Sequence, residues 1–120
     1  MRQNGLALAA ILAFFAVALG AFGAHGLAPV LARHGTGSVW QTAFLYHFLH
    51  ALALLQYFLW NRGPRWIAHL FLLGIFLFSG SLYVLAATGY RKLGIVTPFG
   101  GLLFLIAWLG WAKAACFPKT

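Results

Sequence analysis

Histidines are the side chains of this sequence best suited to chemistry near neutral pH, because an imidazole can bind a metal, carry a proton or exchange hydrogen bonds. His47 and His50 are three residues apart, so on a helix they project from one face. Imidazole is a ligand of copper, zinc and haem iron. This pair is therefore the first candidate for a site.

Carboxylates are missing from the chain, which contains no Asp or Glu. That absence excludes paired-acid hydrolysis, Ser-His-Asp triads and carboxylate-held magnesium or calcium. It also means that hydroxyls or backbone carbonyls must orient any imidazole. We therefore predict that the protein is not an enzyme, and we expect no catalytic residue, no cofactor and no metal ion.

The elements that position the histidines must lie in lipid, because 63% of the 120 residues are hydrophobic and only 7% are charged. Soluble domains need roughly 25% charged residues to form a surface that water can wet. The net charge of +8 comes from basic residues scattered singly between apolar blocks, so it predicts contacts with anionic lipids of the bilayer and no binding of nucleic acid.

Four apolar segments of about 20 residues, the length that crosses a bilayer, are separated by interruptions near 29–37, 61–65 and 88–92. We predict an all-α fold, an integral membrane four-helix up-down bundle. A single transmembrane domain over 1–120 would have spans at approximately 5–26, 42–60, 66–87 and 93–113. The first segment resembles a signal peptide, but we expect it to be retained. Pro98 predicts a kink or a late start of the fourth helix.

Polar side chains from all four spans should meet in the half of the bundle away from the chain termini, because neighbouring spans are antiparallel. We favour neutral histidines that hydrogen-bond to Ser81, Tyr83 or backbone carbonyls. A small-ligand or proton-handling site and a metal or haem site remain as alternatives. The candidate polar cluster consists of His25, His47, His50, Ser81, Tyr83 and Thr97.

Small residues recur every three or four positions along the first segment and so share one helical face. Helices associate in lipid by close backbone approach, which small residues allow. The predicted helix-packing face consists of Gly5, Ala9, Ala13, Ala16, Gly20 and Ala24.

Basic residues also predict the orientation, because cytoplasmic loops carry an excess of Lys and Arg. One end of the bundle would hold Arg2, Arg62, Arg65, Lys113 and Lys119, and the other Arg33, Arg91 and Lys92. We therefore predict an integral protein of a bacterial inner membrane with both termini in the cytoplasm.

Four motifs appear in order along the chain: GAFGAHGL at 20–27, HFLHALALL at 47–55, LFSGSLY at 77–83, and TPFGG at 97–101 followed by Trp108. Together they resemble the domain of unknown function 423 family, which includes the eukaryotic transmembrane protein 256. The resemblance implies a compact four-helix membrane protein and no particular reaction, substrate or cofactor. The chain departs from the family pattern in its first loop, where Arg33 and His34 replace acidic residues.

Two functions are compatible with these residues. The leading expectation is a non-catalytic accessory or structural subunit that packs against other membrane-protein subunits of a larger complex. The alternative is a stand-alone histidine-based binder or transporter of a small ligand or metal, with its site in the non-cytoplasmic half of the bundle. A transporter should surround a water-accessible cavity with its polar groups, whereas a packing subunit should place small residues against a partner.

Overall fold

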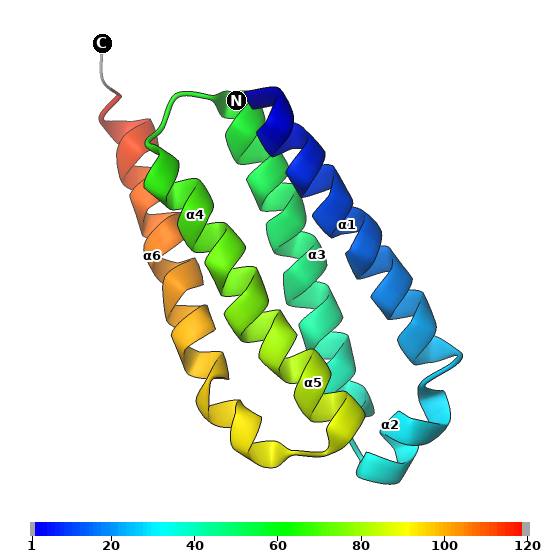
Figure 1. Cartoon of the computed structure of the whole chain (residues 1–120). Coiled ribbons are helices and arrows are strands. Elements are labelled where there is room, and N and C mark those ends of the chain that lie inside the picture. Colours follow the sequence, from blue (N-terminus) through cyan, green and yellow to red (C-terminus); the bar gives the residue numbers. More distant parts are fainter. Residues whose placement is uncertain (1, 119–120) are drawn as a thin grey trace.

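The computed structural model describes residues 2–118, so Lys119, one of the basic residues used to predict orientation, lies outside the described part. Four apolar helices are long enough to cross a membrane: Arg2–Ala24, Gly37–Trp60, Arg65–Thr88 and Arg91–Cys116. They run up and down, with the start of the first helix and the end of the last at one end of the molecule (Figure 1). The predicted all-α up-down fold is confirmed.

The helices differ in detail from the predicted segments. In chain order they are α1 (Arg2–Ala24), α2 (Ala28–His34), α3 (Gly37–Trp60), α4 (Arg65–Gly74), the π-helix η1 (Ile75–Gly80), α5 (Ser81–Thr88), the 3₁₀-helix η2 (Arg91–Ile95) and α6 (Thr97–Cys116). The first interruption thus contains the short helix α2. The fourth span takes the late start that Pro98 allowed, because α6 begins with this proline in its first turn, where its missing N–H leaves no bond unmade.

Three helices, α2, α3 and α5, end at a residue with a left-handed backbone conformation. Gly35 ends α2 with a φ of 66°, Asn61 ends α3 with a φ of 51°, and Gly89 ends α5 with a φ of 72°. This conformation suits glycine and is tolerated by asparagine. The Tyr57 hydroxyl then donates to the carbonyl of Pro64 at 2.5 Å and closes the turn between α3 and α4.

The start of α3 is held to both neighbouring helices. The buried hydroxyl of Thr36 donates to the carbonyl of Ala86 on α5 at 2.6 Å. One turn later the Trp40 indole donates to the carbonyl of Leu19 on α1 at 2.9 Å. Since hydrogen bonds of this kind hold helices together where lipid supplies no partner, they fix α3 between α1 and α5.

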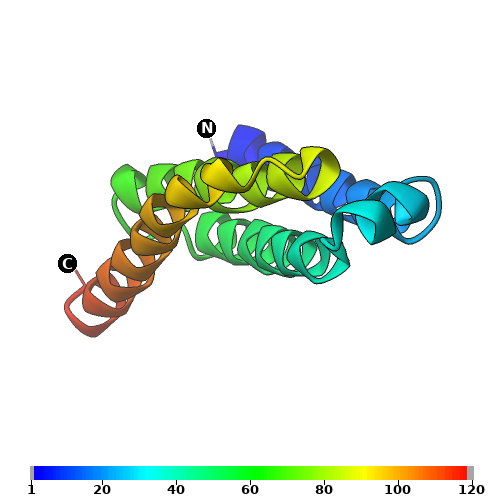
Figure 2. The ribbon, with the colours of Figure 1, turned by 90° about the horizontal axis from the view of Figure 1, so that it is seen from below.

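The helices form an open row rather than a closed ring. α1 packs on α3, the continuous α4–η1–α5 helix packs on α3 beside it, and α6 packs on α4 and η1. Among the described residues, no extensive packing joins α1 to α6, which Figure 2 shows on different sides of the row. Each of these two helices therefore has one packed face and one outer face.

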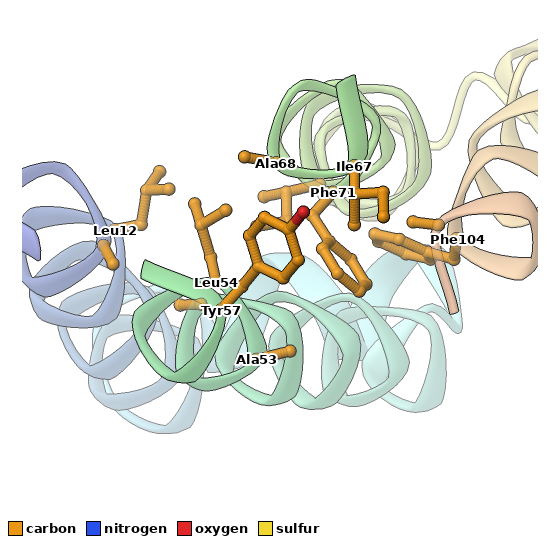
Figure 3. Packing of buried hydrophobic residues seen from close by; sticks show 12 residues of the cluster. Leu12, Ala53, Leu54, Tyr57, Ile67, Ala68, Phe71 and Phe104 are labelled. Carbon is orange, nitrogen blue, oxygen red and sulfur yellow. The ribbon is translucent and has the colours of Figure 1, made fainter. Parts of the chain in front are cut away.

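The main core lies where α3 meets its neighbours. Leu12 of α1, Leu54 of α3, Ile67 and Phe71 of α4, and Phe104 of α6 meet there (Figure 3). Phe71 and Ile67 have no exposed surface. Large side chains on α4 thus fill the space that the small residues of α1 and α3 leave.

The small residues predicted to pack α1 lie mostly toward α3. Ala9 and Ala16 are fully buried, Gly5 is buried, and Ala13 and Gly20 are partly buried. A Cβ on Gly5 would collide with the Phe58 ring, and one on Gly20 would collide with the Phe44 ring.

Ala24 departs from the predicted face, because it is exposed on the last turn of α1. Gly23 is buried in its place, and a Cβ there would collide with the Trp40 indole. The bulk of this indole decides which residue of the last turn is covered, and the spacing pattern contains no information about the ring.

Candidate functional site

The predicted polar cluster is divided into three separate groups in the structure. His47 pairs with Tyr83, His50 pairs with Trp108, and Ser81 pairs with Thr97. Only His25 has no part in them. Each group joins two helices, so each is described by the helices that it connects.

His50 has both ring nitrogens engaged. Its Nε2 accepts a hydrogen bond from the Trp108 indole at 3.0 Å, because an indole N–H can only donate. The ring is therefore the Nδ1-protonated tautomer, and this nitrogen donates to the carbonyl of Tyr46 at 2.8 Å. The ring also stacks on Phe104, with centroids 3.6 Å apart. A neutral, fully paired imidazole thus links α3 to α6.

His47 joins α3 to α5. Its Nδ1 and the Tyr83 hydroxyl are 2.9 Å apart, and the Tyr83 ring packs edge-on against Trp40. The other nitrogen, Nε2, is buried and has no well-formed hydrogen bond among residues 2–118, although the backbone of Leu12 on α1 lies close to this ring. His47 consequently lies where α1, α3 and α5 meet.

Ser81 fastens the beginning of α6 to the third span. Its hydroxyl lies 2.6 Å from that of Thr97 and 2.9 Å from the carbonyl of Phe78, which it reaches as a donor. This bond reaches three residues back along the chain, from the start of α5 to the π-helix η1. The neighbouring Ser79 is fully buried, and its hydroxyl has no partner in the described part of the chain.

His25 is placed differently from the prediction. It is exposed in the turn that follows α1, and no hydrogen bond to the other five residues is found. The prediction rested on its position at the far end of the first helix, and this position alone does not bring the side chain to the other polar residues. A ligand site formed by His25, His47 and His50 together would therefore lack His25.

Sequence reasoning missed one partner of His50, which is Trp108, whereas the carbonyl of Tyr46 is a backbone partner of the kind that it predicted. The available signal for Trp108 was its indole inside an apolar span, because a buried indole N–H needs an acceptor. The chain has no carboxylate, so an imidazole is one of the few side chains in a span that can accept this bond. Tyr46 acts through its backbone carbonyl, which no side-chain motif reveals.

Metal binding has little support in this arrangement. Within residues 2–118, no three side chains of His, Cys, Asp or Glu lie together as ligands would. A metal at His50 would have to displace the bond from Trp108 or the bond to Tyr46. The Nε2 of His47 is enclosed by protein, so a metal ion from outside could not reach it without a rearrangement of the helices. The three pairs link the second, third and fourth spans to one another.

Comparison with known proteins identifies relatives that are membrane proteins. A family model described as "Protein of unknown function (DUF423)" matches residues 19–101. A UPF0382 membrane protein of Haemophilus influenzae is 40% identical, covering 100% of this chain and 99% of that protein. The UPF0382 membrane protein YwdK of Bacillus subtilis is 43% identical over 90% of this chain and 92% of its own. No solved structure matches the chain.

Proposed function

We propose, from the premise that this chain belongs to the DUF423 family of membrane proteins, that it is a non-catalytic accessory subunit that packs laterally against a larger membrane complex. The observation that carries this proposal is the outer face of α1. That face carries a row of small residues beside exposed large ones such as Ile11, Phe15 and Val17, and among the described residues no other helix packs on it.

The outer face of α1 has a pattern suited to another helix. Four exposed alanines share it, on either side of the exposed Phe14. At about 100° per residue they lie half a turn from the face that packs on α3. We call this surface the outer alanine stripe, and it consists of Ala7, Ala10, Ala18 and Ala21.

Lipid and a protein partner favour different residues on such a face. Large apolar side chains suffice toward lipid, as on α6, where Leu105 and Leu109 are exposed. Small residues allow the backbones of two helices to approach closely, and this close packing drives helix association in a bilayer. The outer alanine stripe, with Phe14 as a projecting ring, supports contact with a second transmembrane helix.

The alternative, a histidine-based binder or transporter, has weaker support. It would need the polar groups in the half of the bundle away from the termini to surround a shared cavity. The hydrogen bonds of His50 and Ser81 are instead made to other groups of the protein. The arrangement therefore favours a scaffold role for these residues.

Native mass spectrometry after mild detergent extraction tests the proposal. We expect the wild-type chain to carry a second membrane protein at a fixed ratio. Ala18→Leu, which adds bulk to the outer alanine stripe, should lower the amount retained. Ala112→Leu, the same change at an exposed position of α6, is the matched control and should retain the partner. Equal retention by both variants, or a wild-type chain that carries no protein, would contradict the proposal.

A further inference from the structure

A groove opens on one face of the row, at the end where α1 and α4 begin. Its walls are α1 and α4, and its floor is α3. It has a volume of about 360 Å³, at the lower end of the range for small-ligand pockets. The residues around it include Arg2, Gly5, Leu8, Tyr57, Arg65, Ala68 and Leu72.

The groove exists because α1 and α4 both pack on the same helix, α3. Among the described residues, these two helices do not pack extensively on each other. Gly5 on one wall and Ala68 on the other are small, so neither fills the space between the helices. The opening is therefore a consequence of the open row and of small residues at its edges.

Polarity changes along the groove in the direction of the membrane normal. Arg2 and Arg65 lie at the mouth, at the first residues of α1 and α4. Leu8 and Leu72 lie farther in, about 9 to 11 Å deeper at about 1.5 Å per residue. On the floor, the Tyr57 hydroxyl donates a hydrogen bond to the carbonyl of Pro64, so Tyr57 presents mainly its ring to the groove. The mouth is basic and polar, and the deeper part is apolar.

The charge of the mouth favours an anion. The guanidinium groups of Arg2 and Arg65 border it, and Arg2 is exposed at the first residue of α1. Arginine binds phosphate oxygens through paired N–H groups. The starts of α1 and α4 add partial positive charge at the same place.

We propose that this groove is a binding site for an anionic phospholipid. The phosphate binds at the mouth beside Arg2, and one acyl chain follows Leu8 and Leu72 into the membrane. A free phosphate would match only the mouth, whereas a lipid matches the whole gradient from basic to apolar. Basic pockets between transmembrane helices are known to take anionic head groups. The lipid would also fill the gap between α1 and α4.

Lipid titration of the purified full-length protein in detergent tests this site. The probes are phosphatidylglycerol and, with the same acyl chains, phosphatidylcholine, and native mass spectrometry counts the bound lipid. We expect preference for phosphatidylglycerol, weakened about fivefold by Arg2→Gln, which corresponds to about 1 kcal/mol for one basic residue near an anionic surface. Arg33→Gln, an exposed arginine at the opposite end, is the matched control and should bind as the wild type does.

A second variant separates the lipid from a free anion. Leu8→Trp keeps both arginines but narrows the apolar part, so it should weaken phosphatidylglycerol binding and leave inorganic phosphate binding unchanged. Equal affinity for both lipids, equal loss in Arg33→Gln, or phosphate binding as tight as that of the lipid would overturn the proposal. Because Arg2 is exposed, its variant decides the question even if a change at Arg65 prevents folding.

Discussion

Trp108 and His50 are joined by a 3.0 Å hydrogen bond although, in the part of the chain that the structure describes, the backbones of their helices, α6 and α3, make few close approaches. The indole and the imidazole together bridge the distance between the two backbones. Phe104, which stacks on the same imidazole, adds a second bridge. The position of α6 relative to α3 therefore depends on a few long side chains rather than on close backbone contact.

Substitutions at His50 and Trp108 should be energetically coupled. Trp108→Phe removes the donor and leaves Nε2 unpaired, while His50→Leu leaves the Trp108 indole N–H without its acceptor, at a cost of about 1–3 kcal/mol. A double-mutant cycle on unfolding in detergent should give a coupling of about 0.6 to 1.7 kcal/mol, the range measured between transmembrane helices. His50→Gln, which can still donate and accept, should cost less than His50→Leu. Additive effects would mean that the bond contributes nothing.

The purified protein should contain no stoichiometric metal or haem. The reason is the pairing of both His50 nitrogens, which leaves this imidazole no lone pair for a metal. Elemental analysis and a visible absorption spectrum of one sample provide the measurement, with His50→Gln as the comparison. One equivalent of copper, zinc or haem iron, lost in that variant, would show instead that the histidines form a ligand site.

Added bulk on the packed face of α1 should destabilise the protein. Ala16 has no exposed surface, and Gly20 lies against the Phe44 ring. We expect Ala16→Leu and Gly20→Leu to lower the free energy of unfolding by about 1–3 kcal/mol, the usual cost of overpacking. Ala18→Leu, on the exposed face of the same helix, is the matched control and should leave the isolated protein as stable as wild type. Thermal unfolding in detergent is the measurement, and three equal midpoints would place the packed face in lipid.

Both termini should face the cytoplasm. In a variant with Cys116→Ser, single cysteines at Gln3 and Arg62 should resist a membrane-impermeant thiol reagent added to intact cells, while a cysteine at Arg33 should react. Arg33 is preferred to the nearby Thr36 because Thr36 is fully buried. Labelling at Arg62 from outside would reverse the orientation.

The sequence was sufficient for the features that depend on composition and period. Long apolar runs predicted the four spans, and Pro98 predicted the late start of α6. Small residues such as Ala9 and Ala16 predicted a packed face, and most of that face lies toward α3. These features are local, because each depends on residues within a few turns of one another.

The features that sequence reasoning missed depend on contacts between distant residues. Trp108 and His50 are 58 positions apart, and Thr36 and Ala86 are 50 positions apart. No helical spacing relates such pairs. The rotation of the third span at η1 was also unpredicted, because nothing in its apolar residues distinguishes a π-turn from an α-turn.

Because of this rotation, the side chains of α5 point in directions that differ from those an unbroken α-helix continuing α4 would give. The six residues Ile75–Gly80 of η1 stand between α4, which carries Phe71, and α5, which carries Tyr83. Removing one residue from η1 would restore a continuous α-helix and turn α5 by about 100° relative to α4. Tyr83 would then leave His47 while Phe71 kept its place. The extra residue thus sets the rotation of α5 relative to α4, so a one-residue deletion here would break the hydrogen bond of Tyr83 in the next turn while leaving both of its side chains in the sequence.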